Sequence, residues 1–135
     1  MIFVDSSFWI AIRLRRERHH AEATALLERW ADESLVTSNL VRGETWTFLR
    51  RRDGHRGALA YVEMLERTQR IRVERVTERV ENEALSWLRR HDERAYSFVD
   101  ATSFALMRSM RIREALAFDG DFTAAGFVEL RATTS

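Results

Sequence analysis

Short apolar runs alternate along the chain with longer stretches in which apolar residues recur every three or four positions. The short runs predict five strands, at residues 2–4, 35–37, 71–73, 116–118 and 128–130. The first and fourth runs are apolar throughout, as expected of central strands that are covered on both faces. Residues 71–74 alternate between apolar and charged, which is typical of an edge strand.

The longer stretches predict helices between these strands, each with one apolar face. The clearest faces are Ala23, Leu26, Leu27 and Trp30; Ala58, Val62 and Leu65; and Val80, Ala84, Trp87 and Leu88. Further helices are expected over 6–12, over 40–52 and after Ser97. Strands alternating with helices predict an α/β fold, namely a three-layer α/β/α arrangement around a central, mostly parallel five-stranded sheet. With no Pro and only 5 Gly, residues 1–135 are interpreted as a single domain.

Composition excludes several kinds of chemistry. The chain has no Cys, so disulfides, thiolate catalysis and zinc–thiolate sites are excluded. All 22 basic residues are Arg, and the missing Lys excludes a P-loop lysine and a Schiff base. The first residues lack a basic region and no run of eighteen apolar residues occurs, so we expect neither a signal peptide nor a membrane span, and a cytoplasmic location.

Four acidic residues stand at positions where the pattern is otherwise apolar. Asp5 follows the first strand, Asp100 follows Ser97-Phe98-Val99, and Asp119 follows the fourth strand. Glu44 shares a helical face with Val41 and Phe48, so its side chain is expected to point at the sheet. A carboxylate in apolar surroundings requires a compensating partner.

Each of these acids also has a purely local interpretation. Asp5 or Ser6 can cap the helix that follows, and Asp100 stands at the third helical position of a capping box that opens at Ser97. Asp119-Gly120-Asp121 can form a plain turn, and Glu44 can pair with an Arg.

Ligands of open α/β sheets bind beyond the carboxyl ends of the strands, which is where these acids are predicted to lie. Carboxylates that meet there repel each other by about 1 to 4 kcal/mol per close pair at surface-like dielectric. Such a cluster favours a divalent cation and therefore metal-assisted phosphodiester chemistry.

The order of these motifs along the whole chain resembles the PIN-domain family of ribonucleases, and its size looks most like the VapC-type toxins of bacterial toxin–antitoxin pairs. The matching motifs are Phe3-Val4-Asp5-Ser6-Ser7, Glu44 within a helix, Asp100-Ala101 entering a helix, and Phe118-Asp119-Gly120-Asp121-Phe122. One departure is that Ala117 and Phe118 precede Asp119 where many relatives carry a hydroxyl residue. That departure concerns the supporting hydrogen bonds and leaves the acid in place.

The resemblance implies that Asp5, Glu44, Asp100 and Asp119 hold Mg²⁺ or Mn²⁺, with Asp121 as a further ligand, and that the activity is hydrolysis of RNA phosphodiester bonds. It implies that Ser6 orients a ligand or a water. It also implies an antitoxin protein as partner and a homodimer. Clusters of Arg could follow an RNA backbone or complement helix C-termini. They are Arg13, Arg15, Arg16 and Arg18; Arg50, Arg51, Arg52 and Arg56; and Arg108, Arg111 and Arg113.

Two other functions compete with this interpretation. Asp119-x-Asp121-x-Thr123 after an apolar strand has the form of the nucleophile motif of haloacid-dehalogenase-like phosphatases, but that motif should open a domain and such enzymes use a Lys. A phosphorylated receiver domain fails for the same missing Lys. A non-catalytic binding module, in which the acids only bind metal or a partner, remains open. The four His residues have no second His or Cys at ligand spacing and are expected at the surface.

Overall fold

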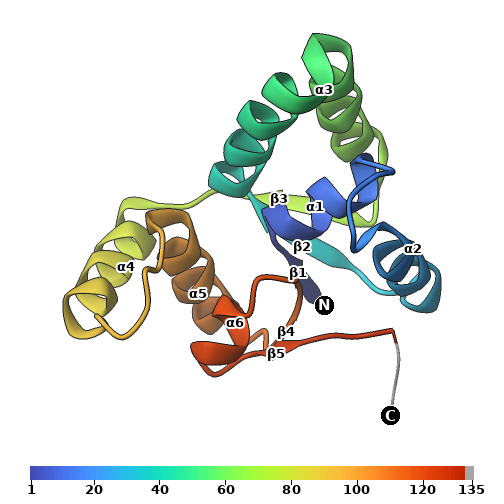
Figure 1. Ribbon diagram of the computed structural model, residues 1–135. Helices are drawn as coiled ribbons and strands as arrows, with labels where there is room; N and C mark the ends of the chain where they lie inside the picture. Colours follow the sequence, from blue (N-terminus) through green and yellow to red (C-terminus); the bar gives the residue numbers. More distant parts are fainter. Residues whose placement is uncertain (133–135) are drawn as a thin grey trace.

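Five parallel strands form one sheet in the computed structural model, which describes residues 1–132 (Figure 1). The last three residues of the predicted domain lie outside the described part. The strands are β1 (Ile2–Val4), β2 (Leu35–Ser38), β3 (Ile71–Glu74), β4 (Glu114–Leu116) and β5 (Val128–Glu129). Their order is β3-β2-β1-β4-β5, so β1 is central and β3 lies at an edge, as the apolar pattern predicts. The sheet is parallel throughout.

The order of the strands reverses next to β1. The chain runs from β1 outward through β2 to β3 and then returns to form β4 on the other side of β1. Phe3 lies opposite Val36 on one side and opposite Ala115 on the other. The carboxyl ends of β1 and β4 therefore form a topological switch point, where the connections separate and leave room for a ligand.

Within residues 1–132, six helices cover the two faces of the sheet and confirm the three-layer prediction (Figure 1). They are α1 (Ser6–Arg13), α2 (His20–Arg29), α3 (Asn39–Arg67), α4 (Glu78–Arg90), α5 (Phe98–Met110) and α6 (Asp121–Ala124). In Figure 1, α1, α2 and α3 lie on one side of the sheet, and α4, α5 and α6 lie on the other. Within residues 1–132, none of the helices combines the length and the apolar composition needed to cross a membrane.

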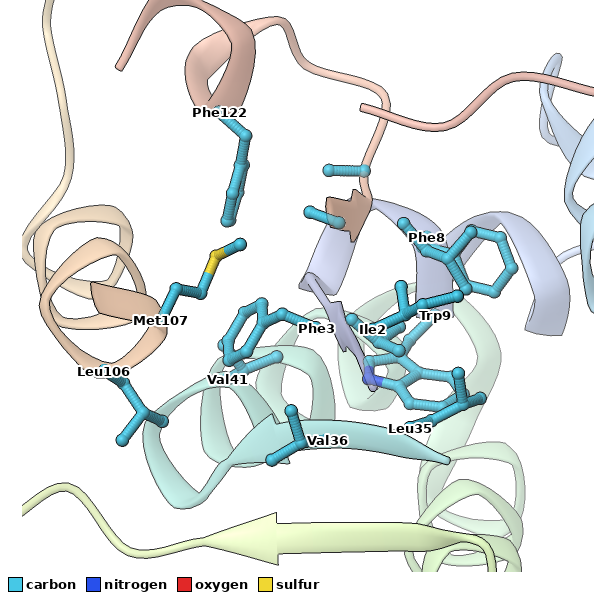
Figure 2. Close-up of a cluster of buried hydrophobic side chains, with 14 of the residues drawn as sticks. Ile2, Phe3, Phe8, Trp9, Leu35, Val36, Val41, Leu106, Met107 and Phe122 are labelled. Atoms are coloured by element: carbon cyan, nitrogen blue, oxygen red, sulfur yellow. The ribbon is translucent and has the colours of Figure 1, made fainter. Parts of the chain in front are cut away.

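The side chains of β1 alternate between these two layers. Figure 2 shows Phe3 directed toward Met107 of α5, while Ile2 lies near Trp9 of α1. All four of these side chains are fully buried, and burial of one such side chain stabilises the fold by about 1.5 to 3 kcal/mol. Core packing therefore fixes β1, and with it the residue that follows β1, relative to both helical layers.

The long helix α3 bends at Gly54. This residue has φ 84° and ψ 175°, a conformation that glycine adopts readily and other residues rarely adopt. The two helices expected over 40–52 and around 58–65 are thus joined through Gly54 with no intervening loop.

The fourth strand differs from its predicted range of 116–118, because it spans Glu114–Leu116. Strand pairing stops where β1 stops, and the amide of Asp5 donates to the carbonyl of Leu116 at 3.0 Å. The amide of Phe118 instead donates to Ser7 Oγ at 3.0 Å, which turns the chain toward α1. Upstream, Glu114 pairs with Val128 of β5, so the strand begins two residues earlier than the apolar run. The last predicted strand likewise ends at Glu129, one residue before its expected end.

Candidate metal centre

Three of the predicted acids meet at the switch point. Asp5 follows β1, Asp100 lies in the first turn of α5, and Asp119 follows β4. One carboxylate oxygen from each lies within 4.8 Å of the other two. Asp5 and Asp100 are only 2% and 9% exposed, whereas Asp119 lies at the surface. Residues that are 95 and 114 positions from Asp5 are thus brought into one acidic cluster, which we call the acidic pocket.

The local interpretations of these acids are also confirmed. Asp5 caps α1, because its Oδ2 accepts from the Ser7 amide at 3.2 Å and from Ser7 Oγ at 2.8 Å. Asp100 Oδ2 accepts from the Ser97 amide at 3.0 Å, which completes the capping box. These bonds engage one oxygen of each acid, so capping orients the carboxylates without preventing them from sharing a pocket. Helix N-termini also favour negative charge.

The turn that carries Asp119 has the predicted geometry. Gly120 adopts φ 81°, and Asp119 Oδ1 accepts from the Asp121 amide at 3.0 Å. This bond holds the Asp119 carboxylate at the end of β4, where it faces the other two acids.

Burial and mutual repulsion make the charged forms of these acids unfavourable. Burial, together with the charge of Asp119, holds the pKa of Asp5 well above its usual range. Burial raises the pKa of Asp100 to about 6, and the charges of Asp121 and Asp119 act in the same direction. Although Asp119 is exposed as a residue, partial burial of its carboxylate also raises its pKa, and the charge of Asp121 acts in the same direction. Among the described residues, none of the three acids forms an ion pair.

The donor set fits a hard divalent cation. Carboxylate oxygens are the ligands that Mg²⁺ and Mn²⁺ prefer, and no nitrogen or sulfur donor belongs to the group. Around Mg²⁺, with bonds of about 2.1 Å, ligand oxygens lie about 3 to 4 Å apart. The observed separation of at most 4.8 Å is close to that range. A cation placed among the three acids would also offset the burial and the repulsion that raise their pKa values.

Glu44 does not point at the sheet as expected. The buried face of α3 carries Val41, Thr45 and Leu49, and Glu44 is exposed beside it. Ser6 Oγ donates to Glu44 Oε1 at 2.7 Å. Because Ser6 directly follows Asp5, this bond holds Glu44 next to the pocket, although Glu44 does not belong to the group of three.

Asp121 also lies outside the group of three. Nε and Nη2 of Arg94 both donate to its Oδ1, at 3.0 and 2.8 Å. The carboxylate is thereby paired with a cation, while the amide of Asp121 orients Asp119. This arrangement favours a supporting role for Asp121 over direct ligation.

Glu129 is a functional candidate that the sequence reading missed. Its side chain is only 2% exposed and pairs with Arg131. Its two oxygens accept from the amides of Gly120 and Thr123, at 3.2 and 3.0 Å, and so hold the turn that carries Asp119. The signal in the sequence is an acid inside a short apolar strand, between Val128 and Leu130.

The three Arg clusters lie in different surroundings. Arg13, Arg15 and Arg16 line a cavity of about 470 Å³ with Arg52 of the second cluster. Arg111 and Arg113 of the third cluster instead line a cavity with Met1, at the amino ends of the strands. The first cluster therefore lies beside Arg52 of the second, whereas Arg111 and Arg113 lie at the amino ends of the strands, away from the acids.

Comparison with known proteins identifies a family and several relatives. Residues 2–128 match the PIN domain family. The "23S rRNA-specific endonuclease VapC20" of Mycobacterium tuberculosis, from strains CDC 1551 / Oshkosh and ATCC 25618 / H37Rv, is 55% identical over 133 residues. Each alignment covers 97% of this chain and 98% of the relative.

Two solved structures have a fold similar to that of this chain. The crystal structure of Mycobacterium tuberculosis VapC20, a "Sarcin-Ricin loop cleaving toxin", is similar with a TM-score of 0.90 and 53% identity, over 97% of this chain and 99% of that one. FitAcB from Neisseria gonorrhoeae gives a TM-score of 0.71 at 15% identity, covering 98% of both chains, which is a likeness of fold alone.

Proposed function

We propose that this chain, which belongs to the PIN-domain family and within it to the VapC-type toxins, is a metal-dependent endoribonuclease. The observation that carries the proposal is the meeting of Asp5, Asp100 and Asp119 at the switch point of the sheet. It occurs in a chain that is 55% identical over 133 residues to an endonuclease specific for 23S rRNA.

In this proposal Asp5, Asp100 and Asp119 hold Mg²⁺ or Mn²⁺. Glu44, which Ser6 holds beside the pocket, is the proposed fourth acid, and Asp121 supports Asp119 through its amide. When bound, the cation polarises the phosphodiester, lowers the pKa of water and stabilises the leaving oxygen.

The other residues of the site bind and orient the substrate. The acidic pocket alone repels a phosphate, so the Arg residues of the first two clusters are needed to draw the RNA backbone toward it. The hydrogen bonds from Ser7 and Ser97 keep the carboxylates of Asp5 and Asp100 in place before the substrate arrives.

The proposed substrate is the sarcin–ricin loop of 23S rRNA, because the names of the similar endonuclease and toxin specify it. The proposed partners are a cognate antitoxin protein and a second copy of this chain. The proposed location is the cytoplasm, where such an RNA occurs.

The test is cleavage of a labelled sarcin–ricin loop RNA by wild type and by Asp5→Asn, with Mg²⁺, Mn²⁺ or EDTA. Wild type should cleave only with a cation, and Asp5→Asn should lose at least about a hundredfold in rate, since even partners that merely orient a metal ligand contribute 10- to 100-fold. Glu114→Gln, an exposed acid at the amino edge, is the matched control and should cleave normally.

Cleavage that persists in EDTA, or that Asp5→Asn leaves intact, would refute the proposal. Cation binding without cleavage of any RNA would instead support the non-catalytic binding module. The phosphatase alternative has little support, because Arg94 pairs with Asp121 and the chain has no Lys.

A further inference from the structure

A second cavity opens beside the acidic pocket. It has a volume of about 390 Å³, and Ser7 and Asp119 form part of its lining. His19, Phe48 and Phe118 supply its aromatic walls. Glu17 lines both this cavity and the Arg-lined cavity described above, so the two hollows adjoin. We call the 390 Å³ hollow the aromatic cavity.

The aromatic cavity contains a flat stack of two rings. The rings of His19 and Phe118 lie 4.4 Å apart at an angle of 5°. Phe118 is fixed from other directions, because its amide donates to Ser7 Oγ, its ring lies 5.8 Å from that of Phe8, and the Arg131 guanidinium lies 5.3 Å from its ring centre. The stack is therefore held in place before any ligand arrives, which reduces the entropic cost of binding.

The hydrogen bonding of His19 points to use of its ring face. Its Nε2 accepts from Arg18 Nε at 3.2 Å, so this nitrogen is already engaged by a cation. The ring is half-buried and parallel to Phe118. The parallel packing on Phe118 orients the His19 ring for stacking.

We propose that the aromatic cavity binds one unstacked nucleobase of the RNA against the His19–Phe118 stack, from a nucleotide adjoining the phosphodiester that is cut. The inference rests on the proposed function, which it deepens by assigning the cavity a role in substrate choice. Asp119 belongs both to the group of three acids and to the lining of this cavity, so base and phosphate would bind at adjoining positions.

Flat rings next to cationic side chains favour single-stranded nucleic acid as the occupant. Proteins recognise unpaired bases by stacking them on aromatic or His rings while cationic residues follow the backbone. Here the rings of His19 and Phe118 adjoin a cavity lined by Arg13, Arg15 and Arg16. A side chain of a protein partner is the competing occupant, and the experiment separates the two.

The experiment measures binding of a fluorescently labelled sarcin–ricin loop RNA in EDTA, by anisotropy, with an abasic nucleotide replacing each loop nucleotide in turn. One abasic position should raise the Kd of wild type by about 5- to 150-fold, as expected for loss of one stacked base. His19→Ala should raise the Kd for intact RNA by a similar factor. The abasic nucleotide at that position should then not raise the Kd of this variant any further. His19→Phe should restore both the affinity and the abasic penalty.

His55→Ala is the matched control, because His55 is exposed on α3 and does not line the cavity; its Kd values should equal those of wild type. An abasic penalty that His19→Ala leaves unchanged, equal losses in His19→Ala and His19→Phe, or no RNA binding at all would overturn the inference. Because binding is measured without cleavage, failure of the nuclease proposal would appear separately, as intact RNA in the presence of Mg²⁺.

Discussion

The two edges of the parallel sheet carry opposite charges. At the carboxyl edge, Asp5, Asp100 and Asp119 share a pocket without forming an ion pair among the described residues. At the amino edge, Arg111 and Arg113 stand before β4. The acid Glu33 near that edge is paired with the N-terminal amino group at 3.0 Å.

Chain direction explains this difference. In a parallel sheet, a helix that follows a strand begins at the carboxyl edge, and a helix that precedes a strand ends at the amino edge. α1 therefore offers its N-terminus to Asp5, while α5 ends at Arg111. N-termini favour anions and C-termini favour cations, each by about 0.3 to 1 kcal/mol. The third Arg cluster is thus explained by a helix C-terminus, and the group of three acids at the carboxyl edge is explained by strand ends and a helix N-terminus.

The largest expected effect concerns stability and pH. The pKa of Asp100 is raised from 3.8 to about 6 in the folded protein, so the folded state binds the proton more tightly than the unfolded chain does. Its contribution to stability is therefore fully present below about pH 4 and is lost as pH rises through 6. The loss amounts to about 3 kcal/mol at most.

In EDTA at pH 7.5, Asp100→Asn should accordingly unfold at higher urea concentration than wild type, and the difference should shrink toward pH 4. Mg²⁺ should remove the advantage by stabilising wild type. Glu114→Gln, at the amino edge, should follow wild type at every pH. If the stability of wild type and of Asp100→Asn changed with pH in parallel, the charge of Asp100 would destabilise the folded protein no more than the charge of Glu114 does.

A smaller effect is expected from Glu129, which holds the turn of Asp119. Glu129→Gln removes the charge and one of the two acceptors that bind the amides of Gly120 and Thr123. Partners that orient a metal ligand contribute about 10- to 100-fold, so kcat/KM should fall by that factor, with a matching rise in the Mg²⁺ concentration for half-maximal activity. An unchanged Mg²⁺ requirement would limit Glu129 to a structural role.

The smallest effect is expected from the Arg residues. Replacing both Arg15 and Arg16 with Ala should weaken RNA binding and reduce the slope of log Kd against log salt by about 1.4, for two lost contacts with single-stranded RNA. Replacing Arg89 and Arg113, which line neither the acidic pocket nor the Arg cavity, is the matched control. Equal slopes for the two double variants would show that RNA does not follow the first cluster.

The sheet, its central strand and its edge were predictable because apolar periodicity reports burial directly. The range of β4 was not, because hydrogen bonds to β1 and β5, and not the apolar run, decide where it begins and ends. Glu44 was placed on the wrong face for a related reason. Thr45 is buried in the core, and its hydroxyl donates to the Val41 carbonyl at 2.8 Å. Because this hydrogen bond lies within the helix, a polar residue can take a core position that the apolar pattern does not indicate.

The site was predictable to the extent that it depends on strand ends. Asp5 and Asp119 follow strands that are neighbours in the sheet. Asp100 lies in the first turn of α5, in a capping box whose residues can be recognised in the sequence. The contacts of Glu129 with the turn at Gly120 and of His19 with the ring of Phe118 join residues from different elements, so the sequence could not show these partners.

Titration of Mn²⁺ by isothermal calorimetry at pH 7.5 tests the central claim most directly, with wild type, Asp5→Asn and Glu114→Gln compared. If the carboxyl edge holds the cation, wild type and Glu114→Gln should bind with the same Kd, and Asp5→Asn should bind at least about tenfold more weakly. Equal Mn²⁺ affinity in wild type and Asp5→Asn would contradict a cation site formed by Asp5, Asp100 and Asp119.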